Sequence, residues 1–184
     1  DAVKTDWNRY AELREQALSD PAGFLRRDLR NEFPYLAKGE REGLLDLRDK
    51  LAKGGDKATE VVSMEQQVTA SINTLQLGQN AEKKGQFQSR AYEEFVLEAK
   101  RLGREPNFDE RQKILDRLML KEDAPWYGRS RTYFEAAGTE DAAGLKVRIP
   151  DSERANITAA LKRANRPVTD AEVMRLFRLK HGLP

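Results

Sequence analysis

Apolar residues recur at every third or fourth position along most of this chain, and charged residues fill the positions between them. In the first segment, Trp7, Tyr10, Leu13 and Ala17 fall on one helical face. The longest such segment runs from about residue 81 to residue 102. Its apolar positions are Phe87, Ala91, Phe95, Ala99 and Leu102. Because this spacing matches the period of an α-helix, we predict an all-α (mainly α) protein of about eight helices.

Capping residues predict where several of these helices begin and end. Asp20 and Pro21 offer an N-cap and a first helical residue for a short second helix. Gly54 and Gly55 should end a third helix, because glycine readily adopts the conformation that terminates helices. The apolar stripe of this third helix is Leu44, Leu45, Leu47 and Leu51.

Three further helix starts are predicted by capping boxes. In a capping box, the first residue of the helix cap and the residue three positions later each accept a hydrogen bond from the other's backbone N–H through their side chains. The pairs are Ser63 with Gln66, Asn107 with Glu110, and Thr169 with Glu172. The first pair predicts a helix that begins near Ser63 and ends at Gly78.

The texture of the sequence changes after residue 121, where proline, glycine and aromatic residues become frequent. Two short stretches, 131–135 and 146–149, have the composition of strands and could pair. We expect a helical bundle region at residues 1–121 and an aromatic, arginine-rich loop at residues 122–149, with room for a small β-hairpin near 131–149. A terminal helical pair at residues 150–184 should pack on the bundle.

The charge balance favours a solvated helical surface. Charged residues make up 35% of the chain, yet 33 Lys and Arg nearly cancel 31 Asp and Glu, which leaves a net charge of +2. A dedicated polyanion binder should instead carry a clustered basic excess. The chain has no cysteine, which excludes disulfides, thiolate zinc sites and thiol nucleophiles and is consistent with a reducing compartment.

The 184 residues suit one domain or two small ones, with a core that could bury about 70% of the unfolded surface. No apolar run approaches the length of a membrane span, so we expect no membrane span in this segment. The opening "DAVKTDWNRY" lacks an initiator Met and a signal-peptide pattern. We therefore expect the sequence to be a fragment or a processed segment.

The terminal pair of helices has the layout of a helix-turn-helix, but its charges run the wrong way for reading DNA. A recognition helix presents its first residues to the groove, and here these include Asp170 and Glu172. Carboxylates at this place would be repelled by phosphates. The same residues suit the positive end of the helix dipole, so packing is the favoured interpretation.

The stretch "PWYGRSRTYF" combines aromatic rings with guanidinium groups. Its candidate binding residues are Trp126, Tyr127, Arg129, Arg131, Tyr133 and Phe134. Such residues can stack on single-stranded nucleic acid or on sugar rings. Alternatively, the aromatic residues pin the loop to the core while the arginines stay in water, which is the interpretation we favour.

The sequence offers few residues that could act as catalytic groups. His181 is the only histidine, which excludes multi-histidine metal sites and places a lone imidazole near the end of the chain. The carboxylate pairs lie on predicted polar faces or helix ends, where solvation and capping account for them. These pairs are Glu93 with Glu94, Asp109 with Glu110, and Glu122 with Asp123. Because no glycine-rich phosphate loop is present either, we predict no catalytic residue, no metal site and no cofactor in this segment.

Three stretches of the chain resemble the helical regions of bacteriophage internal virion proteins, also called DNA-ejection proteins. They are "DWNRYAELREQALSDPAGFLRRDLRNEFPYL", "LGREPNFDERQKILDRLML" and "IPDSERANITAALKRANRPVTDAEVMRLFRLKHG". Members of this family lie inside the capsid or at the portal and leave with the genome to form a conduit across the host envelope. Their long chains often carry a lytic transglycosylase domain, but its catalytic glutamate motif has no counterpart here.

The resemblance implies a non-catalytic structural or assembly segment of a phage internal virion protein, located in the virion interior and delivered to the host envelope. Its expected partners are other virion proteins or copies of itself, with weak contact to peptidoglycan or nucleic acid. The alternative is a peptidoglycan- or nucleic-acid-binding domain attached to a lytic transglycosylase. A bacterial regulator with a terminal helix-turn-helix ranks last.

Overall fold

A computed structural model describes residues 3–77, 80–121, 132–136 and 147–183 of the chain. Within these ranges the protein is all-α: nine α-helices and one 3₁₀ helix follow one another, and no strand is present. The chain divides into two compact units, Asp1–Leu115 and Asp116–Pro184. The predicted fold class is therefore confirmed.

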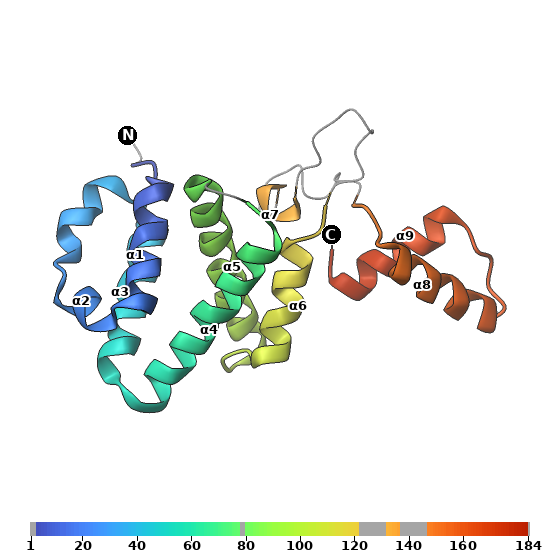
Figure 1. Cartoon of the computed structure of the whole chain (residues 1–184). Helices are drawn as coiled ribbons and strands as arrows, with labels where there is room; N and C mark the ends of the chain where they lie inside the picture. The colour runs from blue at the N-terminus through green and yellow to red at the C-terminus, as the bar shows by residue number, and fades with distance from the viewer. Residues whose placement is uncertain (1–2, 78–79, 122–131, 137–146, 184) are drawn as a thin grey trace. The chain divides into compact units, whose positions relative to one another are not determined.

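The first unit begins with four helical elements that enclose its main core (Figure 1). They are α1 (Trp7–Ser19), α2 (Pro21–Arg26), the 3₁₀ helix η1 (Leu29–Tyr35) and α3 (Lys38–Lys53). Asp6 and Asp20 cap the first two helices through hydrogen bonds from backbone N–H groups. The cap at Asp20 and the end of α3 at Gly54 confirm two predicted boundaries.

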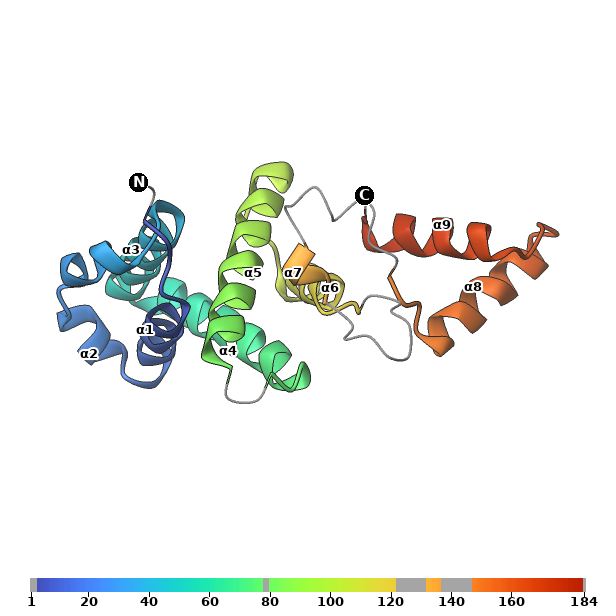
Figure 2. The same ribbon diagram turned by 90° about the horizontal axis from the view of Figure 1, so that it is seen from above.

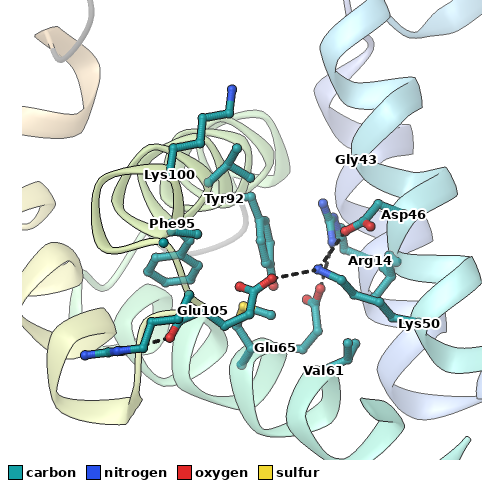
Figure 3. Close-up of a pocket in the computed structure, with 16 residues that line it drawn as sticks. Arg14, Gly43, Asp46, Lys50, Val61, Glu65, Tyr92, Phe95, Lys100 and Glu105 are labelled. Atoms are coloured by element: carbon teal, nitrogen blue, oxygen red, sulfur yellow. Dashed lines mark hydrogen bonds and ion pairs between the residues drawn. The ribbon is translucent and has the colours of Figure 1, made fainter.

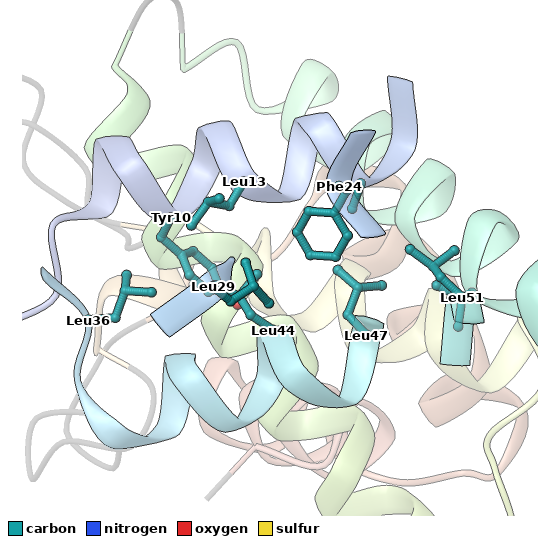
Figure 4. Packing of buried hydrophobic residues seen from close by; sticks show 10 residues of the cluster. Tyr10, Leu13, Phe24, Leu29, Leu36, Leu44, Leu47 and Leu51 are labelled. Carbon is teal, nitrogen blue, oxygen red and sulfur yellow. The ribbon is translucent and has the colours of Figure 1, made fainter. Parts of the chain in front are cut away.

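The apolar faces of these elements meet in one cluster, which Val61 of the following helix also joins (Figure 4). Its buried members are Tyr10, Leu13, Ala17, Phe24, Leu29, Leu36, Leu44, Leu47, Leu51 and Val61. Leu45 was predicted to share the stripe of α3 but remains 38% exposed, because it lies one residue past Leu44 and therefore faces away from the core.

The next three helices complete the first unit and run into the second. They are α4 (Gly55–Thr74), α5 (Ala81–Leu102) and α6 (Phe108–Leu118). Figures 1 and 2 show α4 leaving the end of α3 and crossing α5. Close packing of α5 on α1 depends on Gly85, since a Cβ there would stand 2.5 Å from the Trp7 carbonyl oxygen. The bounds of α5 agree with the predicted segment at residues 81–102.

The predicted helix start at Ser63 is wrong. Ser63 lies inside α4, which begins directly after Gly54. Gly54 and Gly55 both have positive φ, so the backbone reverses within two residues and one helix follows the other without a linker. The serine–glutamine spacing is a local pattern that the interior of a helix can also satisfy. The helix ends at Thr74, while the predicted terminator Gly78 lies outside the described residues.

The second unit contains the end of α6, the short helix α7 (Tyr133–Ala136), and the terminal helices α8 (Asp151–Arg163) and α9 (Asp170–His181). Its buried apolar residues are Leu118, Tyr133, Phe134, Val147, Ile149, Ile157, Leu161, Val173 and Phe177. Helices α8 and α9 pack against each other, and Thr169 caps α9 by accepting a hydrogen bond from the Glu172 backbone N–H at 3.2 Å. The two terminal helices and the cap at Thr169 are as predicted, while the expected packing of the pair on the bundle stays a prediction.

The expected strand at residues 131–135 is wrong over its described part, because Tyr133–Ala136 form α7. Thr132 and Glu135 have capping-box spacing, and the Glu135 carboxylate accepts hydrogen bonds from the Thr132 backbone N–H and hydroxyl at 2.8 and 2.9 Å. This cap starts a helix where the β-favouring side chains predicted a strand. Among the described residues, an isolated antiparallel bridge joins Lys121 to Thr132.

Candidate functional site

A groove runs between α3 and α5 in the first unit, and its floor is formed by α1 and α4. One part of it is a pocket of about 630 Å³ (Figure 3), and the other is a pocket of about 480 Å³. The two pockets share five lining residues: Arg14, Gly43, Asp46, Tyr92 and Val96. We refer to both together as the α3–α5 groove.

The floor of the groove holds a buried charge network. Arg14, 3% exposed, donates a hydrogen bond from Nη1 to Oε1 of Glu65 at 2.8 Å. Its Nε and Nη2 both donate to the Tyr10 hydroxyl, at 3.0 and 2.9 Å. The guanidinium carbon also lies 3.9 Å from the centre of the Tyr92 ring, and Figure 3 shows Tyr92 reaching from α5 towards Arg14 and Glu65. One arginine thus links α1, α4 and α5.

The electrostatics of this network keep Arg14 charged and both tyrosines neutral. Burial acts to lower the pKa of Arg14, but Tyr10 and Glu65 outweigh it and the pKa is raised. Burial raises the pKa of Tyr10, and it raises the pKa of Tyr92 well above its usual value, with the Glu65 charge adding to the effect. The network is therefore a neutralised ion pair enclosed by phenol groups, and none of these pKa shifts produces a general acid or base near pH 7.

Two glycines keep the α3 wall of the groove low. Gly39 and Gly43 are one helical turn apart, and both line the smaller pocket. A Cβ at Gly43 would stand 3.3 Å from Nη2 of Arg14, whereas a Cβ at Gly39 would meet no atom within 4 Å. The opposite wall, on α5, carries Val96 and Leu97, which are 53% and 58% exposed. The groove therefore presents apolar side chains to solvent beside an open channel.

Charges along the rim differ between the two ends of the groove. The smaller pocket is bordered by the carboxylates of Glu42, Asp46 and Glu93. The larger pocket is bordered by the cations of Lys50, Lys100 and Arg104, together with Glu105 and with Asp46, which lines both pockets. Several of these groups form exposed ion pairs, such as Asp46 with Lys50 at 2.9 Å and Glu93 with Arg90 at 2.6 Å.

Two of the carboxylates considered in the sequence, Glu93 and Glu110, have structural partners. Glu93 pairs with Arg90, and Glu110 completes the capping box with Asn107 through two hydrogen bonds. Hydrogen bonds from Arg104, and then from the Asn107 backbone N–H, lower the pKa of Glu110 to about 2, opposite to what a general acid requires. Glu122 and Asp123 lie outside the described residues.

The aromatic and arginine stretch is only partly described. Trp126, Tyr127, Arg129 and Arg131 lie outside the described residues. Tyr133 and Phe134 are 7% and 4% exposed. Burial of these two rings favours the anchoring interpretation for this end of the stretch, because a stacking platform needs accessible ring faces.

Several charges of the terminal helical pair form ion pairs within the pair itself. Glu172 forms ion pairs with Arg166 at 2.6 Å and with Arg175 at 2.9 Å, while Asp170 pairs with Arg154 at 2.9 Å. His181 Nε2 lies 3.0 Å from Glu153. These contacts are those of a packing unit, and they leave the first turn of α9 acidic.

Two structural findings concern metal sites and membrane-spanning helices. Across the described ranges, no group of three or more His, Cys, Asp or Glu side chains is arranged to hold a metal ion. None of the helices described is both long enough and apolar enough to span a bilayer.

No family model matches the chain, and neither a curated protein nor a solved structure is significantly similar to it. The resemblance to phage internal virion proteins therefore stays a prediction from sequence motifs. Sequence reasoning missed the α3–α5 groove and its network. One signal was present: Arg14 occupies the same helical face as Tyr10 and Ala17, where an apolar residue is expected.

Proposed function

We propose that this chain is a non-catalytic assembly segment of a bacteriophage internal virion protein involved in genome ejection. The observation that carries the proposal is the α3–α5 groove, in which exposed apolar residues border a channel whose charged floor is already neutralised. The phage context is supported by the three sequence stretches that resemble the family. The proposed location is the virion interior, from which the protein is delivered to the host envelope.

A packing role suits the groove better than a catalytic one because its deepest ionisable groups are committed to each other. Arg14 and Glu65 are both nearly inaccessible and are joined at 2.8 Å. Removing either partner would leave an uncompensated buried charge, which is costly to a fold. A network of this kind holds three helices in place, and the raised pKa values of Tyr10 and Tyr92 make their hydroxyls poor proton donors near pH 7.

The partner best suited to the groove is an amphipathic α-helix of another virion protein. A helix laid in a groove contributes apolar residues at three- and four-residue intervals. The low wall at Gly39 and Gly43 leaves room for it, and Val96 and Leu97 supply apolar contacts. Basic residues at one end of that helix would face the carboxylates of the smaller pocket, and this arrangement would fix its direction.

The phage context and the groove can be tested separately. Mass spectrometry of purified virions from the source phage should detect peptides of the chain, such as "EPNFDER". Virions that lack the protein would contradict the phage context. In virions assembled with the variant Val96→Glu, incorporation should fall at least about tenfold, since a carboxylate would be buried against an apolar partner.

The matched control is Leu179→Glu, because Leu179 is 71% exposed on α9 and lies outside the groove. This variant should be incorporated at the wild-type level. Equal incorporation of both variants would contradict the groove as the docking surface. A change from monomer to dimer that depends on Val96 would show that the occupant is a second copy of the chain.

A further inference from the structure

Four arginines line a hollow in the first unit, on the side of α3 that does not border the α3–α5 groove. This hollow has a volume of about 530 Å³ and lies where the end of α2, the 3₁₀ helix η1 and α3 meet. Its lining consists of Arg26, Arg27, Arg30, Arg48, Asp28, Leu29, Phe33 and Leu45. We name it the arginine hollow. The net charge of +2 for the whole chain conceals this local excess of positive charge.

Two of the four arginines have defined structural contacts. Arg27 forms an ion pair with Glu32 at 2.7 Å, and Glu32 also pairs with Arg9. Arg48 donates from Nη2 to the carbonyl oxygen of Leu25 at 3.1 Å, which fixes its side chain but leaves its positive charge without a carboxylate partner in the described ranges. Arg48 is therefore a fixed cation in the wall of the hollow.

The other two arginines have no structural contact to explain them. Arg26 and Arg30 are exposed, and no hydrogen bond or ion pair of either guanidinium group is found among the described residues. Asp28, whose carboxylate accepts the Arg30 backbone N–H at 3.1 Å as the cap of η1, supplies one negative charge against the two positive charges of Arg26 and Arg30. Like charges gathered in this way repel one another unless an anion lies between them.

The shape of the site favours a narrow anionic chain over a flat surface. Arg48 is half-buried and lines a recess together with Phe33, so a bilayer surface could not reach it without deforming. A sugar–phosphate backbone is thin enough to enter a recess of this size. Its phosphates accept the forked hydrogen bonds of guanidinium groups, and exposed apolar area such as that of Leu45 can contact sugar rings.

We propose that the arginine hollow binds the phosphate groups of a nucleic-acid backbone, with Arg26, Arg30 and Arg48 as the phosphate contacts. Binding of this kind reads no sequence, because phosphates carry no base information. The hollow and the α3–α5 groove border different sides of α3, so this function is additional to helix docking and does not depend on it.

The test is a fluorescence anisotropy titration of the whole protein with a labelled dT₂₀ strand and with a labelled 20-base-pair duplex. At about 50 mM salt we expect micromolar binding that weakens steeply as salt increases, since phosphate contacts release counterions. The double variant Arg26→Gln/Arg30→Gln should bind at least about tenfold more weakly. Its slope of log affinity against log salt should be smaller by about two, one for each lost contact.

The matched control is Lys162→Gln/Arg163→Gln, which removes the same charge from the exposed surface of α8. Helical circular dichroism should be unchanged in both double variants, because none of the four side chains is buried. Equal weakening by both double variants would overturn the proposal in favour of net charge alone. Absence of nucleic-acid binding, or Arg26- and Arg30-dependent binding to phosphatidylserine vesicles in its place, would overturn it as well.

Discussion

Two ion pairs of nearly equal length serve the two units of this protein differently. In the first unit, Arg14 and Glu65 are 2.8 Å apart with side chains only 3% and 4% exposed. In the terminal helical pair, Lys180 and Glu153 are 2.7 Å apart with side chains 60% and 23% exposed. Burial, and not distance, decides how much each contact matters, because water screens the second pair and cannot reach the first.

The two units are also organised differently. The first unit encloses its strongest charge contact beneath a groove and is held together around it. The terminal pair keeps its charges at the surface and depends on a few buried apolar residues and a capped turn. Substitutions at the buried pair should therefore affect stability much more than substitutions at the exposed pair.

The largest effect is expected for Arg14→Met. This change leaves the Glu65 carboxylate buried without its partner and should lower the free energy of unfolding by about 3–5 kcal/mol. Urea denaturation followed by circular dichroism measures it. The double variant Arg14→Met/Glu65→Met removes both charges and should recover most of the loss. A single variant as stable as the wild type would remove the basis of the comparison.

A smaller effect is expected for Thr169→Ala in the terminal pair. Because Thr169 accepts the Glu172 backbone N–H, its loss leaves the start of α9 uncapped and should cost about 0.5–2 kcal/mol. The same denaturation measurement applies. Thr169→Ser keeps the hydroxyl and is the control, which should remain close to the wild type. A full loss in the serine variant would show that the methyl group, and not the cap, is responsible.

Much of the fold follows from local sequence, and the errors have physical reasons. The limits of α5 could be predicted because Asn80 caps its start and Gly103 ends it in the left-handed conformation. Ser63 was misleading because the start of α4 is decided by the backbone conformation of Gly54 and Gly55. A capping pattern predicts a helix start correctly when the capping residue itself begins the helix. It fails at Ser63, because α4 has already begun at Gly55, where the backbone turns through two residues of positive φ.

The candidate sites were harder to predict, because they depend on contacts between distant residues. Arg14 and Glu65 are separated by 51 positions, and nothing in either neighbourhood indicates that they will meet. The stretch "FLRRDLR" contains three of the four arginines that line the arginine hollow, but the fourth, Arg48, comes from α3. Overall composition pointed away from such a cluster, since a balanced total does not reveal how charges are distributed in space.

The smallest effect is expected for Glu153→Gln. Partial burial acts to raise the pKa of Glu153, but hydrogen bonds with Lys180 and His181 outweigh it and lower the pKa below its usual 4.5. A lowered pKa contributes stability above about pH 4.5, which is lost as the pH falls through the folded-state value.

Because water screens this site, the glutamine variant should lose less than about 1 kcal/mol at pH 7. The difference from the wild type should disappear in strongly acidic solution. Chemical denaturation at a series of pH values from 7 downwards measures it. A difference that grows as the pH falls would have the wrong sign and would refute this assignment.

The central claim is that the buried charges of the first unit are structural and that this segment catalyses nothing. Its most direct test is the release of muropeptides from purified peptidoglycan by the wild-type protein and by Arg14→Met/Glu65→Met. The account predicts no release above a buffer control for either protein. Release by the wild type that disappears in the folded double variant would contradict it, since Arg14 and Glu65 would then belong to an active site.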